Sequence, residues 1–279
     1  MMYGIAFGDI AGSPYEFGKK AENDFKLIDK AKKHMFTDDS VLTAAICNAL
    51  LETSDLTNEV ELRSNVRKYL QQFTIDFPFA GYGARFFSWV EGFEFLPYNS
   101  YGNGAAMRIS PVAWVGKTVE EVFTLSDICT GVTHNHPEGI KGARAIALAV
   151  FLARNCKKGG DRTDKENKES IRQSIQQRFY LLDFSLQEIK DTYVWSSSCQ
   201  GTVPQAIIAF LESNNYESAI RNAIGIGGDC DTIAAMTGAI AEAYYGVPEK
   251  CKAIAKSYLD QKLITVFDAF EEKFQLPFS

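Results

Sequence analysis

The chain has 279 residues, of which 46% are hydrophobic, enough at this length to bury a substantial core, so disorder is not expected. Its 29 basic and 35 acidic side chains give a formal net charge of −6, which excludes an overall polycationic surface for nucleic acid or an anionic membrane. The first residues do not have the pattern of a signal peptide, no eighteen apolar residues run together, and the six scattered cysteines lack a CxxC pair. We therefore expect a cytoplasmic protein with reduced thiols and no membrane segment.

A short glycine-containing segment near the N-terminus carries the first candidate catalytic group. Gly8 and Gly12 are four residues apart, a spacing that permits close packing, and Glu16 follows them. Asp9 and Ser13 are residue types that cap helices. Taken alone, the segment is as consistent with capping and a solvated Glu16 as with catalysis.

The first acidic cluster, Thr37-Asp38-Asp39, stands where a helix is predicted to begin. Apolar residues then recur at spacings of three and four, and an acidic start suits the helix dipole. These apolar residues are Val41, Leu42, Ala45, Ile46, Ala49 and Leu50. We expect one aspartate at the N-cap and the other in the first turn, with simple capping as the alternative to metal binding.

A long segment rich in Gly, Asn, Tyr and Pro, from Phe93 to Met107, predicts an ordered loop. Exposed backbone N–H groups in the overlapping segment Tyr98–Arg108 could hold a phosphate without any charged side chain, although many such loops bind nothing. Thr133 and His134 then precede a helix that is predicted to begin at Pro137. A histidine in such a place either caps or packs, or it hydrogen-bonds a ligand.

The second half of the chain also has a helical period. Residues 157–169 are charged and predict a surface loop. A helix is expected from Thr202 to Leu211, with Pro204 near its first turn, and another around residues 219–224. Glycines from Gly225 onward are expected to end that second helix.

The second acidic cluster, Asp229-Cys230-Asp231-Thr232, is predicted to begin a further helix. The following residues, 233–241, are mostly small, which lets another backbone approach closely, so we expect this helix to be central. Strand-like alternation is scarce, and we therefore predict an all-α fold without a sheet. No repeat or linker divides the chain, so residues 1–279 are expected to form a single domain.

Together the two clusters supply four carboxylates and two threonine hydroxyls. These hard oxygen donors suit magnesium, manganese or calcium better than zinc. Clustered carboxylates that are not neutralised repel one another. The repeated pattern therefore favours a shared cation site, large enough for two ions if the clusters converge.

Five motifs in chain order resemble those of the ADP-ribosylglycohydrolase family, which includes the dinitrogenase reductase-activating glycohydrolase. They are Gly8-Asp9 with Gly12 and Glu16, Phe36-Thr37-Asp38-Asp39-Ser40, Gly102-Asn103-Gly104-Ala105-Ala106-Met107-Arg108, Thr133-His134, and Gly227-Gly228-Asp229-Cys230-Asp231-Thr232. The resemblance runs from residue 4 to about residue 246. The charged stretch at residues 157–191 departs from it.

The resemblance implies a compact, all-α, orthogonal multi-helix bundle with two magnesium ions in a cleft, manganese being an alternative metal. The implied metal ligands are Thr37, Asp38, Asp39, Asp229, Asp231 and Thr232. Glu16 would lie near the scissile bond as the leading acid/base candidate, with Asp38 and Asp39 as further catalytic candidates. The implied substrate-binding residues are Ser100, Tyr101, Gly102 and Asn103, with the adjoining Gly104, for the diphosphate, and His134 for the ADP-ribose.

The implied activity is hydrolysis of the glycosidic bond at the distal ribose of an ADP-ribosylated protein or a small ADP-ribosyl compound, with ADP-ribose as product. The linkage stays open between arginine, serine, O-acetyl-ADP-ribose and nucleic acid. A phosphohydrolase using Asp229 and Asp231 fits less well, because that pair follows glycines and Thr232 comes immediately after it. A non-catalytic ADP-ribose-binding module is disfavoured because Glu16 and all the implied ligands are present.

Overall fold

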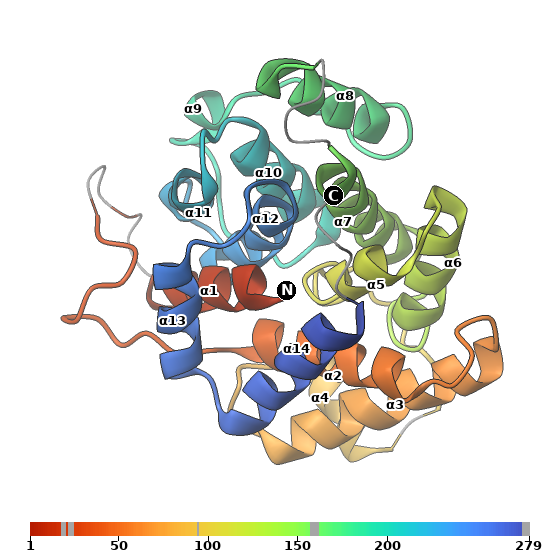
Figure 1. Ribbon diagram of the computed structural model, residues 1–279. Coiled ribbons are helices and arrows are strands. Elements are labelled where there is room, and N and C mark those ends of the chain that lie inside the picture. The colour runs from red at the N-terminus through yellow and green to blue at the C-terminus, as the bar shows by residue number, and fades with distance from the viewer. Residues whose placement is uncertain (18–20, 22–24, 94, 157–161, 275–279) are drawn as a thin grey trace.

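The computed structural model describes residues 1–17, 21, 25–93, 95–156 and 162–274. Over these ranges the chain forms fourteen α-helices, one short 3-10 helix and no strand, which confirms the predicted all-α class. Figure 1 shows the helices gathered around two central ones, α1 (Tyr3–Gly12) and α12 (Cys230–Tyr245).

The central pair packs through small residues. A β-carbon placed on Gly8 would lie 2.1 Å from the carbonyl oxygen of Ala234, and one on Gly238 would lie 2.1 Å from that of Gly4. A β-carbon on Gly12 would likewise lie 2.5 Å from the carbonyl oxygen of Cys230. The two helices are therefore antiparallel and in backbone contact. This confirms the expectation that the helix after the second acidic cluster is central.

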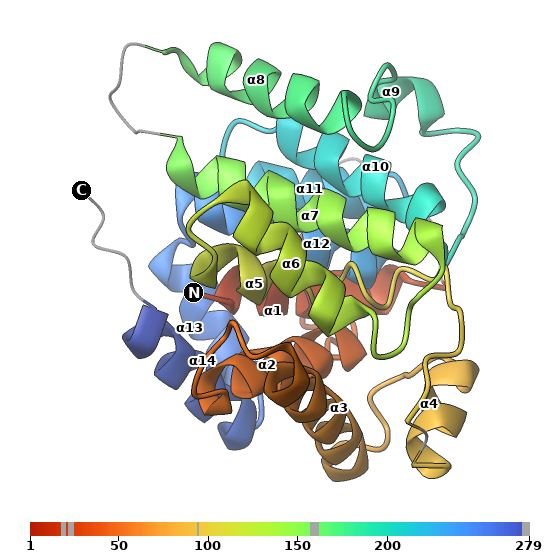
Figure 2. The same ribbon diagram turned by 90° about the vertical axis from the view of Figure 1, so that its right-hand side faces the viewer.

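The other helices surround this pair. The α-helices that pack against α12 are α2 (Asp38–Glu52), α7 (Pro137–Asn155), α10 (Cys199–Leu211) and α11 (Tyr216–Gly225), and the short 3-10 helix η1 (Ser13–Tyr15) contacts it as well. The remaining ones are α3 (Glu59–Asp76), α4 (Ala84–Glu91), α5 (Ser110–Val115), α6 (Val119–Thr130), α8 (Asp164–Gln176), α9 (Leu186–Ile189), α13 (Glu249–Tyr258) and α14 (Gln261–Phe274). Figure 2 shows α8 and α9 at one end of the molecule and α3 near the other.

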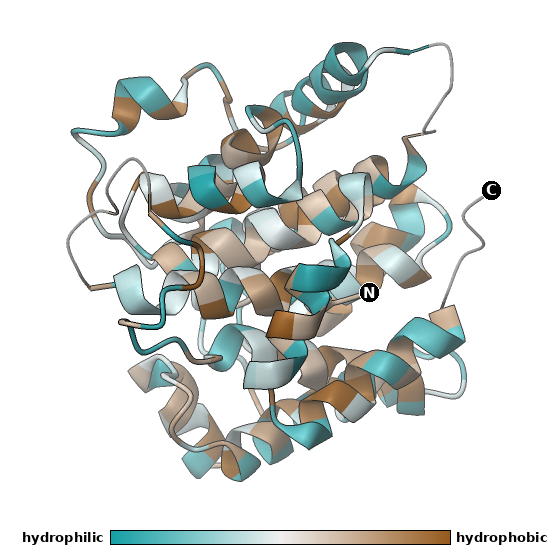
Figure 3. Ribbon diagram, turned by 60° about the vertical axis from the view of Figure 1, so that its left-hand side comes forward, coloured by the Kyte–Doolittle hydropathy of each residue, from teal (hydrophilic) through white to brown (hydrophobic). Residues whose placement is uncertain are grey.

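Hydrophobic residues concentrate in the inner helices, whereas the outer α8 is largely hydrophilic, as Figure 3 shows. None of the six cysteines forms a disulfide within the described residues, and five of them are buried, as expected for small apolar side chains. No described helix combines the length and apolar character needed to cross a membrane.

Two predicted boundaries differ from the structure. Helix α10 begins at Cys199, because the Ser198 side chain accepts a hydrogen bond from the Gly201 backbone N–H at 3.2 Å, and this places Pro204 in the helix interior. Within the predicted surface loop, residues 157–161 lie outside the described residues, and α8 begins at Asp164 after a capping box at Thr163. The loop predicted over residues 93–107 is confirmed at its described positions.

Candidate active site

Acidic side chains from three elements that are distant in sequence converge at one point. Carboxylate oxygens of Asp9 on α1, Asp39 on α2 and Asp231 on α12 all lie within 4.8 Å of one another. A second group of the same compactness joins Asp231 to Asp229 and Glu16. Asp231 belongs to both groups, so the two acidic clusters of the sequence form one continuous patch.

Asp9 holds the N-terminus of α2 in place. Its carboxylate accepts hydrogen bonds from the Thr37 backbone N–H at 2.9 Å, the Thr37 hydroxyl at 2.8 Å and the Ser40 backbone N–H at 3.2 Å. The Ser40 hydroxyl donates to it as well. Asp9 therefore caps a helix other than its own, by satisfying N–H groups that the first turn of α2 leaves without helical partners.

Asp39 retains one oxygen atom that is buried and has no hydrogen-bond partner among the described residues, namely Oδ1. Its other oxygen, Oδ2, lies 3.1 Å from the Thr37 hydroxyl and 3.2 Å from the Thr232 hydroxyl. The N-cap of α2 is Thr37, whose hydroxyl accepts from the Asp39 backbone N–H at 3.4 Å. Neither aspartate occupies the N-cap, which corrects the expected arrangement, and Asp39 faces the acidic patch from the first turn.

Asp229 occupies the N-cap position of α12 without making a side-chain cap. Its carboxylate instead accepts a hydrogen bond of 2.7 Å from the side-chain amide of Asn103. Capping therefore does not explain why an aspartate stands here. The contact also joins the Gly/Asn-rich loop, residues 98–107, to the acidic patch.

Burial and mutual repulsion make the patch resist ionisation. Burial raises the pKa of Asp9 to about 6, and burial together with the charge of Asp229 raises the pKa of Glu16 to about 7. Burial and the surrounding carboxylates raise the pKa of both Asp39 and Asp231 well above their usual range. No ion pair formed by the described residues includes a carboxylate of this patch.

The residues of the patch fit a hard divalent cation. Their donors are carboxylate and hydroxyl oxygens, and the Asp39 Oδ1 atom is buried without a partner. Cys230, which lies inside the second cluster, directs its thiol away, toward the Ile224 carbonyl oxygen at 3.8 Å. A cation would supply the positive charge that these buried carboxylates lack.

Asp38 lies at the margin of the patch. It is half-buried, belongs to neither compact group, and its backbone N–H donates to the Ala80 carbonyl oxygen at 2.7 Å. Burial, with the charges of Asp9, Asp229 and Glu16, nevertheless raises the pKa of Asp38. Asp38 therefore contributes to the same electrostatic environment without making the closest contacts.

The Gly/Asn-rich loop is held on two sides. On one side, the Asn103 backbone N–H donates to the Ser197 carbonyl oxygen at 2.8 Å, and the Cys199 N–H donates to that of Tyr101 at 3.0 Å. Within the loop, the Ser100 hydroxyl accepts from the Gly102 N–H at 3.1 Å.

The other side of the loop rests on His134. A β-carbon on Gly104 would lie 3.4 Å from His134 Nε2, and His134 itself is buried. The loop, His134 and the acidic patch therefore form one region, linked by Asn103.

Sequence reasoning missed three contributors to this region: Asp9 as the cap of α2, Ser40 as its partner, and Arg108, whose fully buried guanidinium donates to Thr133 at 2.7 Å. Asp9 carried a signal, since a capping residue type followed Gly8, but the helix that it caps begins 29 residues later. Arg108 stood in a motif without a stated role.

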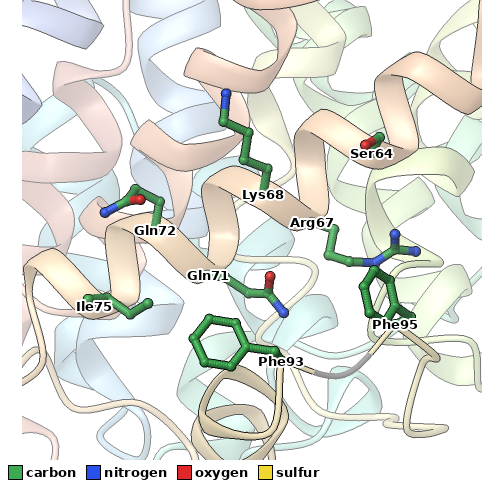
Figure 4. Close-up of a pocket in the computed structure, with 8 residues that line it drawn as sticks. All are labelled: Ser64, Arg67, Lys68, Gln71, Gln72, Ile75, Phe93 and Phe95. Carbon is green, nitrogen blue, oxygen red and sulfur yellow. The ribbon is translucent and has the colours of Figure 1, made fainter.

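A separate hollow of about 280 Å³ lies between α3 and the chain that follows α4 (Figure 4). It is lined by Ser64, Arg67, Lys68, Gln71, Gln72, Ile75, Phe93 and Phe95. None of the predicted site residues lines it. The acidic patch remains the region where the predicted groups meet.

The comparisons with known proteins agree with this fold. The sequence model of the ADP-ribosylglycohydrolase family matches residues 1–274, so the chain belongs to that family. Membership supports a hydrolase that acts on ADP-ribosyl linkages.

The chain is similar to the ADP-ribosylhydrolase ARH3 of Homo sapiens, with 27% identity over 283 residues, covering 82% of this chain and 77% of that protein. It is also similar to the ADP-ribosyl-[dinitrogen reductase] glycohydrolase of Rhodospirillum rubrum, with 25% identity and coverages of 88% and 84%. A solved structure described as an ADP-ribosylglycohydrolase-related protein complex matches with a TM-score of 0.60 and 19% identity over 95% of both chains. That last likeness concerns the fold alone.

Proposed function

We propose that this protein is a magnesium-dependent hydrolase that cleaves the glycosidic bond at the distal ribose of an ADP-ribosyl compound. The observation that carries the proposal is the meeting of Asp39, Asp231 and Glu16 in one patch of carboxylates without a counter-cation among the described residues. Membership of the family supports the reaction class. The metal and the substrate are inferred from the chemistry of the site.

Two divalent ions are assigned to the acidic patch, with magnesium as the preferred metal and manganese as the alternative. The proposed ligands are Thr37, Asp38, Asp39, Asp229, Asp231 and Thr232. When bound, such ions fix sugar hydroxyls and increase the acidity of a bound water. The chain's own part is to hold these oxygens on the starts of two buried helices, with Asp9 fixing the start of α2.

Glu16 is the proposed acid/base residue. It is half-buried and lies within reach of Asp229 and Asp231, so it borders both the acidic patch and the exposed side of the site. A carboxyl group in that position can exchange a proton with the leaving group or with the attacking water. Asp38 and Asp39 are the other catalytic candidates, because they present carboxylates from the same helix start.

The Gly/Asn-rich loop is proposed to bind the diphosphate of the substrate. The proposed binding residues are Ser100, Tyr101, Gly102, Asn103 and Gly104. Of these, Gly102 and Gly104 lie against the Nε2 edge of His134, and the proposed contact uses backbone N–H groups of the loop together with that ring. Asn103 has a second task, because its amide already donates to Asp229. One residue thus couples the diphosphate site to the metal site.

The substrate class is an ADP-ribosylated protein side chain or a small ADP-ribosyl compound, and the product is ADP-ribose. Groups around the leaving group set the linkage, because the proposed contacts above all recognise the shared ADP-ribose half. Arginine, serine, O-acetyl and nucleic-acid linkages are therefore candidate substrates.

A panel of defined ADP-ribosyl substrates, each assayed for release of ADP-ribose with Mg²⁺, tests the proposal and identifies the linkage together. We expect turnover of at least one member of the panel. Tight binding of ADP-ribose without turnover of any member would indicate a binding module instead. Release of inorganic phosphate from simple phosphoesters, with no cleavage of ADP-ribosyl bonds, would indicate a phosphohydrolase.

A further inference from the structure

His134 lies beneath the Gly/Asn-rich loop with one ring nitrogen directed at it. His134 Nε2 lies 3.4 Å from the position of a β-carbon on Gly104 and 3.8 Å from one on Gly102. Among the described residues, this nitrogen has no hydrogen-bond partner, although the side chain is only 4% exposed. The absence of side chains at the two glycines leaves the Nε2 edge open toward the loop.

The other ring nitrogen, Nδ1, belongs to a buried chain of polar groups. It lies 2.8 Å from the Thr133 hydroxyl oxygen, which lies 2.7 Å from Nη2 of Arg108. Arg108 is 1% exposed, and its guanidinium lies over the Phe86 ring at 5.5 Å. All three polar side chains are therefore held in place by the core.

The direction of these hydrogen bonds follows from what each group can do. A guanidinium only donates, so the Thr133 oxygen accepts from Arg108. The single hydroxyl hydrogen of Thr133 then has two acceptors within reach, His134 Nδ1 at 2.8 Å and the Thr130 carbonyl oxygen at 3.5 Å. The shorter contact has hydrogen-bond geometry of ordinary strength, whereas the longer one is at the limit. If Nδ1–H donated instead, the hydroxyl hydrogen would have only the Thr130 carbonyl oxygen at 3.5 Å, so the arrangement in which the hydroxyl donates to Nδ1 is favoured.

The charge state of the ring agrees with this direction. Burial, with the nearby positive charges of Arg108 and Arg85, lowers the pKa of His134 well below its ordinary value. A neutral imidazole carries one hydrogen, and if Nδ1 accepts from Thr133 that hydrogen lies on Nε2.

We propose that Arg108 and Thr133 are positioning residues that hold neutral His134 in its Nε2–H tautomer, so that the ring donates a hydrogen bond to an anionic oxygen seated over Gly102 and Gly104. The identity of that oxygen as part of a diphosphate rests on the proposed function, whereas the tautomer does not. Recognition at this point thus depends on a threonine hydroxyl that does not face the ligand. This arrangement also disfavours protonation of both His134 ring nitrogens, which would place a second positive charge near Arg108.

Long-range ¹H–¹⁵N correlation NMR on the whole protein tests the tautomer directly, because the correlation pattern shows which ring nitrogen carries hydrogen. The chain has three histidines, and the signals of this ring are those lost in the His134→Gln variant. We expect the Nε2–H form in the wild-type protein and in Thr133→Ser, which keeps the hydroxyl. We expect Thr133→Val, of nearly the same shape, to populate the Nδ1–H form. An Nδ1–H ring in the wild-type protein, or no change in a folded Thr133→Val, would overturn the proposal.

Addition of ADP-ribose tests the donor role. We expect the Nε2–H resonance of wild type and Thr133→Ser to shift on binding, and Thr133→Val to bind ADP-ribose about fivefold to tenfold more weakly, the loss of about one hydrogen bond. An Nε2–H resonance that does not move when ADP-ribose is bound would contradict the donor role even if Thr133→Val fails to fold. If no ADP-ribosyl substrate is turned over, the proposed function fails while the tautomer measurement still decides this inference.

Discussion

At the scale of single residues, the unpartnered Oδ1 atom of Asp39 is the most informative feature of the site. A buried carboxylate oxygen without a hydrogen bond carries a desolvation cost of several kcal/mol unless the group is protonated or paired. Asp39 cannot pair with a basic side chain in the described structure, since none reaches the patch. A cation therefore gives the simplest physical reason for the arrangement.

Asp39→Asn should weaken metal binding while relieving repulsion in the metal-free protein. We expect the variant to be more stable than wild type in EDTA, and to lose most of the stabilisation that Mg²⁺ gives, which is about 3 kcal/mol at a hundredfold excess over the dissociation constant. Thermal unfolding with and without Mg²⁺ measures both effects. The control is Asp183→Asn, which removes an exposed carboxylate. Equal stabilisation by Mg²⁺ in wild type and Asp39→Asn would contradict the assignment of Asp39 as a ligand.

Glu16→Gln should separate catalysis from metal binding. The change keeps the shape of the side chain but removes proton exchange, so we expect kcat to fall by about 10² to 10⁴-fold. Stabilisation by Mg²⁺ should be kept, because the proposed ligands are unchanged. Steady-state kinetics beside thermal unfolding measure the two effects, with Glu91→Gln on the surface as the matched control. A fully active Glu16→Gln would exclude Glu16 as the acid/base residue.

At the scale of helices, the backbone contact between α1 and α12 fixes the geometry of the site. Asp9 stands on α1 beside Gly8, and Asp231 stands at the start of α12, so the distance between these carboxylates depends on how closely the two helices approach. Small residues at spacings of four on both helices permit that approach. The packing of one helix pair is in this way linked to the convergence of the acidic groups.

Gly8→Ala should therefore destabilise the fold and weaken metal binding together. The added carbon would meet the Ala234 carbonyl oxygen at 2.1 Å, and the helices must separate to accept it. We expect a loss of about 1 to 3 kcal/mol or more in the free energy of unfolding, measured by urea denaturation.

Gly225→Ala provides the comparison for Gly8→Ala, because nothing lies within 4 Å of the added carbon at the last residue of α11. This control should be neutral or slightly stabilising. A Gly8→Ala protein as stable as Gly225→Ala would contradict the tight backbone packing of α1 against α12.

Local patterns predicted the helices, and tertiary contacts decided the details. The apolar period after Asp39 and the small residues after Thr232 were sufficient to predict α2 and the central α12. The pattern could not show which of two consecutive aspartates faces the patch, because that depends on the phase of α2 relative to its neighbours. The role of Asp9 as the cap of α2 was not predicted for a similar reason, since its partners Thr37 and Ser40 come close only in the folded chain. Acidic motifs are visible in the sequence, but their partners are not.

At the scale of the whole molecule, we propose that the chain folds as a single domain, because the acidic patch draws on both its first and its last hundred residues. Asp9 and Asp39 come from one end of the sequence, and Asp229 and Asp231 from the other. Cooperative unfolding in one transition is the expected consequence. The site would then exist only when the entire bundle is assembled.

The stability of the metal-free protein should fall as the pH rises from about 5 to about 8. The pKa values of Asp9 and Glu16 are raised to about 6 and about 7, so the folded state binds protons more tightly than the unfolded chain does. The stability that these groups contribute is complete below about pH 4 and is lost as the pH passes their folded values. Mg²⁺ should reverse much of the fall, because it binds the ionised carboxylates.

Thermal unfolding across this pH range, in EDTA and in Mg²⁺, checks the prediction. A larger stabilisation by Mg²⁺ at pH 8 than at pH 5 is expected for wild type, and a smaller difference for Asp39→Asn. A melting temperature in EDTA that stays constant or rises between pH 5 and pH 8 would contradict it.

The most direct test of the central claim is the release of ADP-ribose by metal-stripped protein to which Mg²⁺ is added back. The account predicts no turnover in EDTA, recovery as Mg²⁺ is titrated, and little recovery in Asp39→Asn when Asp183→Asn recovers fully. Undiminished release of ADP-ribose from the metal-stripped wild-type protein would contradict it.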